Sequence, residues 1–246
     1  MILAIFLGSL ILLMLLGMPI AFSLMLTGIA LMVHLNFFDA QLIAQNMLSG
    51  ADVYPLMAVP CFILAGELMN AGGISSRIIG LASSMVGHIQ GGLGYVAIAA
   101  TLLLGCFSGS ALADTAAVAT LLIPMMRDNG YPVARSAGLI AAGGVIAPIV
   151  PPSMPFIIFG VTTGTSISGL FVAGIVPALL RATGLVIVWY MISRNMDVKL
   201  QPKSTWKQRG IALVDALWAL MLPVIIVGGM RTGLFTPTEA AAVAAV

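Results

Sequence analysis

Residues 91–126 read GGLGYVAIAATLLLGCFSGSALADTAAVATLLIPMM, and this stretch decides the fold of the chain. It consists of two apolar arms on either side of the polar tripeptide Ser108-Gly109-Ser110. Each arm holds about 13 to 17 residues, fewer than the roughly 20 that an α-helix needs to cross the hydrocarbon core of a bilayer. Two short arms that meet at a Ser/Gly tip predict a re-entrant helical hairpin, which enters the membrane and returns to the side it came from.

The composition of the whole chain is that of an integral membrane protein. Hydrophobic residues make up 61% of the 246 residues and charged residues only 7%, against about 25% charged residues in soluble domains. Residues 1–38 hold no formally charged side chain, and they are too long and too poor in basic residues for a cleavable signal peptide. The net charge of +2 comes from scattered basic residues, so we expect the lipid bilayer and no nucleic acid as a partner.

The residues before the hairpin alternate between apolar and amphipathic stretches. Residues 2–35 are too long for one straight crossing, and Gly17-Met18-Pro19 in their middle predicts a strongly tilted, kinked helix or a broken helix pair. Residues 36–52 and 74–88 mix polar and apolar side chains, which is typical of helices at the membrane interface. Residues 54–70 between them are predicted to form a span.

The hairpin is followed by a second irregular stretch. Residues 132–166 are apolar, but four prolines interrupt them between positions 148 and 155: Pro148, Pro151, Pro152 and Pro155. Such a cluster cannot continue a helix, so it predicts a discontinuous helix with an unwound middle. Residues 170–193 and 211–230 are ordinary spans, separated by a polar loop at 194–209. Thr236 and Pro237 are typical of an N-cap and a first helical residue.

The basic loop sets the expected topology. Cytoplasmic loops are enriched in Lys and Arg, so residues 194–209 are predicted to be cytoplasmic, as are both feet of the hairpin. The N-terminus is also cytoplasmic if residues 2–35 cross once. A copy of the same element order beginning at Thr236 would then be inverted relative to the first. Since the chain stops inside an apolar helix, we expect it to be a truncated sequence; the alternative is a small, complete membrane protein.

The two breaks, at residues 108–113 and 148–155, are the candidate site. Irregular backbone at membrane depth is tolerated only where it is buried in protein or lines an aqueous cavity. Meeting near the midplane, the breaks would present free carbonyls and the hydroxyls of Ser108, Ser110 and Ser153, which suit a hard cation such as Na⁺, while helix N-termini favour an anion. The alternative is that both breaks are purely structural kinks that bind no ligand.

Asp114 is the only acidic residue of the hairpin, and an intramembrane carboxylate needs a partner or water. Three roles remain open: capping the N-terminus of the second arm, orienting the loop by accepting its amide hydrogens, or ligating a cation. The three tryptophans, Trp189, Trp206 and Trp218, are interpreted as interfacial. The sequence contains no zinc-protease, phosphate-loop or nucleophile-elbow motif, so an enzyme is not expected.

Four strings occur in order along the chain, at residues 17–22 (GMPIAF), 109–117 (GSALADTAA), 151–155 (PPSMP) and 235–241 (FTPTEAA). With these strings, the chain resembles over its whole length the large membrane subunit (M subunit) of tripartite ATP-independent periplasmic (TRAP) transporters. The resemblance implies an all-α, polytopic transmembrane protein of the ion-transporter superfamily, working as an elevator with two inverted repeats.

On this resemblance the chain divides into four regions. Residues 1–90 would be scaffold and interfacial helices, and residues 91–166 the transport region, with the hairpin at 91–126 and the broken helix at 132–166. Residues 167–230 would add further spans around the 194–209 loop, and residues 231–246 would begin the second repeat. Members of the family are nearly twice this length, so the second hairpin is absent and the chain is not expected to transport alone.

The resemblance also implies function. The subunit would lie in the bacterial inner membrane and import small organic anions, namely C4-dicarboxylates, sugar acids, or sialic or keto acids. It would use a Na⁺ gradient and no further cofactor, with a periplasmic substrate-binding protein and a small four-helix (Q-type) membrane subunit as partners. The first Na⁺ site would use two groups of residues, supported by Asp114: Ser108, Gly109 and Ser110 of the hairpin, and Pro151, Pro152 and Ser153 of the broken helix.

Two alternatives remain at this stage. One is a divalent-anion symporter of the same superfamily that needs no binding protein, which gene context would distinguish. The other is a channel or a passive membrane scaffold, for which paired breaks would be unnecessary.

Overall fold

The computed structural model describes residues 1–196 and 198–245, and every regular element in these ranges is helical. The helices form two units, Met1–Val53 and the chain from Tyr54 onward. The first unit contains α1 (Ile2–Leu15), α2 (Ile20–His34) and α3 (Ala40–Ala51). The second contains η1 (Tyr54–Met57), α4 (Ala58–Ala71), α5 (Ile74–Val86), α6 (Gly92–Ser108), α7 (Ala111–Asp128), α8 (Val133–Gly144), α9 (Met154–Thr163), α10 (Ile167–Ser193), α11 (Trp206–Arg231) and α12 (Pro237–Ala245).

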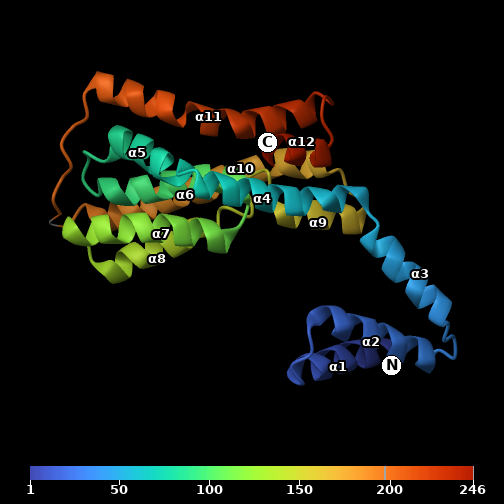
Figure 1. The fold of residues 1–246 in the computed structure, drawn as a ribbon. Helices are drawn as coiled ribbons and strands as arrows, with labels where there is room; N and C mark the ends of the chain where they lie inside the picture. The colour runs from blue at the N-terminus through green and yellow to red at the C-terminus, as the bar shows by residue number, and fades with distance from the viewer. Residues whose placement is uncertain (197, 246) are drawn as a thin grey trace. The chain divides into compact units, whose positions relative to one another are not determined.

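In the first unit the long apolar stretch is broken where the sequence predicted. Gly17 adopts a positive φ of 80° and Pro19 immediately precedes α2, so the stretch forms a helix pair. The two helices pack side by side (Figure 1), and the stretch therefore turns back on itself instead of making the single crossing assumed for the N-terminus. The cytoplasmic N-terminus stays a prediction. The interfacial stretch forms α3, where Asp39 Oδ1 accepts hydrogen bonds from the backbone N–H groups of Gln41 and Leu42.

In the second unit both predicted breaks are present. α6 and α7 pack against each other as a helical hairpin whose non-helical tip is Gly109-Ser110. α8 and α9 are separated by residues 145–153, which form turns and bends, so the discontinuous helix is confirmed. α8 packs on both arms of the hairpin, as the neighbouring green and yellow-green helices of Figure 1 show. The division into scaffold and transport regions stays a prediction.

Three segments of the described part are long and apolar enough to cross a membrane: Tyr54–Ala71, Ile167–Ser193 and Trp206–Arg231. The hairpin arm α6 and the half-helix α9 are apolar but shorter, which fits segments that enter the membrane without crossing it. The all-helical, polytopic fold class expected from the sequence is therefore what the chain adopts.

The polar loop is shorter than predicted. We expected it to extend over residues 194–209, but α11 already begins at Trp206. The reason is a capping box, in which Thr205 Oγ1 accepts from Gln208 N–H while Gln208 Oε1 accepts from Thr205 N–H. The charged first turn of α11 therefore belongs to the helix that carries the next span.

The interfacial interpretation is wrong for one of the three tryptophans. Trp206 and Trp218 are both 85% exposed, but Trp189 is only 1% exposed, inside the core of the second unit. Its Nε1 donates a hydrogen bond of 2.8 Å to the carbonyl of Gly91, and its ring stacks on Tyr131. A Cβ on Gly94 would overlap the indole, so the glycine-rich start of α6 makes room for this ring.

Candidate functional site

The hairpin tip is built by three consecutive residues. Gly109 leaves α6 in a left-handed conformation with φ of 57°, which glycine adopts without steric cost. Ser110 then takes an extended conformation and starts α7, its Oγ accepting a hydrogen bond of 3.4 Å from Ala113 N–H. The order Ser-Gly-Ser thus encodes a helix end, a reversal and an N-cap within three positions.

Asp114 stabilises this tip through the hydroxyl of Ser108. Ser108 Oγ donates a hydrogen bond of 2.7 Å to Asp114 Oδ1 and accepts one of 3.0 Å from Ser110 N–H. Ser108 and Asp114 are 8% and 2% exposed. The end of α6, the tip and the first turn of α7 are therefore joined by one short, buried hydrogen-bond chain.

This arrangement bears on two of the roles left open for Asp114. Ser110, not Asp114, caps α7, so the expected capping role of the carboxylate is wrong. The carboxylate contacts the loop through a serine hydroxyl and does not accept amide hydrogens from the described residues of the loop, and its orienting role stays a prediction. Its other oxygen, Oδ2, is buried and has no hydrogen-bond partner among the described residues, so it could accept a proton, a water molecule or a cation.

The two breaks meet in space. A Cβ added to Gly109 would lie 2.8 Å from the carbonyl oxygen of Pro152 and 3.2 Å from Cα of Ser153. One turn earlier, a Cβ on Gly105 would lie 2.7 Å from Cα of Ala147. Glycines in α6 therefore allow the tip of the hairpin to touch the unwound part of the broken helix backbone to backbone.

Ser153 holds the unwound segment together. It is fully buried, and its Oγ donates to the carbonyl of Pro148, across the bend. Its own carbonyl accepts from Ile157 N–H at 3.2 Å, in the first turn of α9. The preceding bond, Pro151–Pro152, is cis. Of the predicted site residues, Ser108, Gly109, Ser110 and Asp114 thus form one group, and Gly109 joins it to Pro152 and Ser153.

Several close contacts around the site were not recognised in the sequence. A Cβ on Gly66 of α4 would lie 3.1 Å from Cβ of Ser108, and one on Gly143 of α8 would lie 2.7 Å from Oγ1 of Thr101. A Cβ on Gly144 would overlap the hydroxyl of Thr115 in α7. Glycines inside apolar helices were the available signal, since they commonly mark close helix–helix approach in membranes.

The geometry brings together four helix ends. The last turn of α6 leaves carbonyls without a partner inside the helix, although that of Gly105 accepts from Gly109 N–H, and the carbonyl of Pro152 lies next to Gly109. These oxygens suit a hard cation. The N-termini of α7 and α9 start at the same two breaks, and helix N-termini favour negative charge. The site can therefore hold a cation and an anionic group close to each other.

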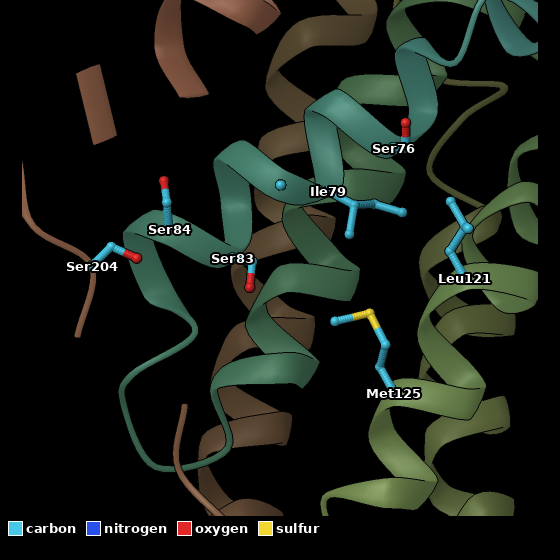
Figure 2. A pocket seen from close by; sticks show the side chains of 8 residues that line it. Ser76, Ile79, Ser83, Ser84, Leu121, Met125 and Ser204 are labelled. Carbon is cyan, nitrogen blue, oxygen red and sulfur yellow. The ribbon is translucent and has the colours of Figure 1, made fainter. Parts of the chain in front are cut away.

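One cavity lies beside the candidate site, and a second lies apart from it. A cavity of about 470 Å³ is lined by α6, α10 and α11 and includes Pro151 of the unwound segment. Another, of about 400 Å³, lies between α5 and α7, where Figure 2 shows serines of α5 across from Leu121 and Met125. The second cavity contains none of the predicted ion-binding residues.

The chain is similar to known proteins over nearly its whole length. Residues 7–246 match the family model of the tripartite ATP-independent periplasmic transporter, DctM component. The chain is 55% identical over 241 residues to the 2,3-diketo-L-gulonate TRAP transporter large permease protein YiaN of Escherichia coli K12, covering 98% of the chain and 57% of that relative.

More distant relatives are named for other organic anions. The sialic acid TRAP transporter large permease protein SiaM of Vibrio cholerae is 45% identical, covering 92% of the chain and 53% of the relative. The C4-dicarboxylate TRAP transporter large permease protein DctM of Rhodobacter capsulatus is 36% identical, covering 97% and 58%. The chain thus spans somewhat more than half the length of these transport proteins, none of which is named as an enzyme. It belongs to the DctM component family of tripartite ATP-independent periplasmic transporters.

Proposed function

We propose that this chain is part of the large permease subunit of a Na⁺-coupled secondary transporter that imports small organic anions. The observation that supports it best is the contact of Gly109 with Pro152 and Ser153, because two broken helices that meet inside a membrane are the architecture of an ion and substrate site. The relatives named for diketogulonate, sialic acid and C4-dicarboxylates support an organic carboxylate as the substrate class.

The proposed Na⁺ site lies between the hairpin tip and the unwound segment. Backbone carbonyls and serine hydroxyls around Ser108, Gly109 and Ser110 supply oxygens from one side, and those around Pro151, Pro152 and Ser153 from the other. Asp114 supports the first group through the Ser108 hydroxyl and adds negative charge behind the ion. Bound Na⁺ would hold the two breaks together, and the adjacent N-termini of α7 and α9 would then receive the substrate carboxylate.

A periplasmic substrate-binding protein and a small four-helix membrane subunit are the proposed partners, and the bacterial inner membrane the proposed location. The inverted second repeat and the elevator motion belong to the same proposal. Family membership supports these assignments, since the tripartite family is periplasmic by description.

The test is uptake of sugar acids and dicarboxylates into proteoliposomes, using the full-length subunit with its small partner and binding protein. Ser110→Ala and Ser153→Ala are compared with Ser49→Ala, a matched change of an exposed serine in α3 that bonds only to its own helix. We expect uptake to require Na⁺ and the binding protein, and to fall in the first two variants alone.

Three results would contradict parts of the proposal. Uptake that needs Na⁺ but no binding protein would indicate a simple anion symporter of the same superfamily. A flux that does not saturate with substrate would indicate a channel. Uptake that is unchanged in both site variants, with normal protein levels, would place the ion elsewhere.

A further inference from the structure

Arg181 carries a positive charge at the centre of a membrane-spanning helix. It is residue 15 of the 27 in α10, with 14 residues before it and 12 after it. At 1.5 Å per residue these arms are about 21 Å and 18 Å long, so a hydrocarbon core about 30 Å thick that is centred on α10 has Arg181 near its middle. Arginine at this depth is rare and costly, and normally faces a partner or water.

The described part of the chain supplies no partner for this guanidinium. Arg181 is exposed, and no residue within 1–196 or 198–245 forms a hydrogen bond or ion pair with its side chain. Helices of the second unit carry five acidic residues, and none of them is placed to bind it: Glu67, Asp114, Asp128, Asp215 and Glu239. Asp128 ends α7 at the foot of the hairpin, and Glu239 accepts hydrogen bonds from Thr236. Asp114 is buried against Ser108, and α4, which carries Glu67, does not pack on α10.

Asp215 of α11 is also out of register with Arg181. The cavity between α10 and α11 places Leu179 opposite residues 223–231, and Asp215 precedes Pro223 by eight residues, or about 12 Å of helix. Arg181 follows Leu179 by two residues and so points about 200° away from it around the helix axis. The guanidinium therefore faces away from α11.

We propose that Arg181 forms an intramembrane ion pair with a carboxylate on a transmembrane segment in the part of the large permease that this chain lacks. The chain spans 57% of the Escherichia coli relative YiaN, so a permease of that length has further segments to pack against this unit. A desolvated arginine binds a carboxylate in preference to lipid tails. The inference rests on the proposal that the chain functions within a permease of that length.

The experiment measures the amount of folded, membrane-inserted full-length subunit and does not measure transport. A failure of the Arg181 proposal is therefore distinguishable from a failure of the proposed Na⁺ coupling. Arg181→Glu is compared with Arg194→Glu, a matched reversal at the C-cap of the same helix. We expect roughly tenfold or more loss of folded subunit in Arg181→Glu alone, because it places two like charges together away from water. In the Arg181→Glu background, each acidic residue of the remaining spans is then changed to Lys, one at a time. We expect one of these second substitutions, and only one, to restore the amount of folded subunit.

A second measurement keeps the proposal falsifiable if the variants fold poorly. Arg181→Cys and Arg194→Cys are made with Cys61 and Cys106 replaced by Ala, and treated with a membrane-impermeant thiol reagent. We expect Arg194→Cys to react and Arg181→Cys to be protected. Rapid labelling at position 181 would mean that the arginine faces water, and the proposal would be wrong. Two further results would overturn the proposal. An Arg181→Leu variant of unchanged stability would show that the side chain faces lipid. Rescue of Arg181→Glu by a substitution in the small subunit would assign the carboxylate to that partner.

Discussion

The hydroxyl of Ser108 donates a hydrogen bond of 2.7 Å to Asp114 Oδ1 and accepts one of 3.0 Å from the backbone N–H of Ser110. One side chain thereby connects the end of α6, the hairpin tip and the first turn of α7. Because all three groups are buried or half-buried, loss of this hydroxyl would leave polar groups without water to replace it.

Ser108→Ala is therefore expected to lower the free energy of unfolding by about 1–3 kcal/mol, the cost of leaving a buried acceptor without a partner. Thermal unfolding of the purified subunit in detergent measures this. The matched control is Ser136→Ala, since Ser136 is fully buried but bonds only to the carbonyl of Pro132 at the start of its own helix. Equal losses in the two variants would show that the Ser108 hydroxyl has no special role.

Asp114→Asn separates the shape of the carboxylate from its charge. The amide oxygen can still accept from Ser108, so the free energy of unfolding should change by less than about 1 kcal/mol. The negative charge behind the proposed ion site is lost, and the Na⁺ concentration for half-maximal uptake should rise by about tenfold, equivalent to about 1.4 kcal/mol.

The control for that substitution is Asp128→Asn at the last residue of α7, which removes a carboxylate from the foot of the hairpin instead of its tip. Na⁺ activation should be unchanged there. An unaltered Na⁺ dependence in Asp114→Asn would remove the carboxylate from the ion site, and a collapse of folding would assign it a purely structural role.

Gly109→Ala tests the contact between the two breaks. The new Cβ would lie 2.8 Å from the carbonyl oxygen of Pro152, and φ of 57° is unfavourable for alanine. Gly164→Ala is a matched control, because Gly164 has φ of 68° and no atom within 4 Å of its Cβ position. Both should lose about 1 kcal/mol of stability from backbone strain.

Only Gly109→Ala should lose a further 1–3 kcal/mol, roughly the cost of overpacking. The difference in melting temperature between the two variants isolates the contact with Pro152 from the backbone conformation. Identical melting temperatures would mean that the hairpin tip and the unwound segment do not touch in the folded protein.

Trp189→Phe is expected to destabilise the second unit by about 1–3 kcal/mol, because it removes one of the two N–H donors to the buried carbonyl of Gly91 and makes a fully buried ring smaller. Trp218→Phe, at a position 85% exposed, should change stability by less than about 0.5 kcal/mol. Tryptophan fluorescence during unfolding compares the two directly. A larger effect at Trp218 would mean that this side chain is covered by another part of the assembled transporter.

Much of the fold could be predicted because its interruptions have local causes. Gly17 and Gly109 adopt the positive φ that favours glycine, and four prolines cluster at residues 148–155, so the helix pair, the hairpin and the broken helix were all recognisable from sequence. The end of the polar loop was missed because the capping box at Thr205 and Gln208 competes with an otherwise polar, loop-like composition.

The candidate site was predictable only in part. The serines and Asp114 stand out as polar residues in apolar surroundings, but their partners do not. Nothing in the sequence indicates that the Ser108 hydroxyl stands between Asp114 and the tip. Trp189 was assigned to the interface because tryptophan usually lies there, and its partner, Gly91, is 98 residues away.

The sequence by itself determined that the chain is a membrane protein, where its helices break, and which polar residues stand at the breaks. These features depend on hydropathy and on the backbone chemistry of glycine, proline and serine, which act over a few neighbouring residues. Only the tertiary structure decided that Gly109 meets Pro152, that Gly66 approaches Ser108, and that Arg181 has no partner within the described residues. Such contacts depend on how whole helices pack, and the energy of packing is shared among residues far apart in the chain.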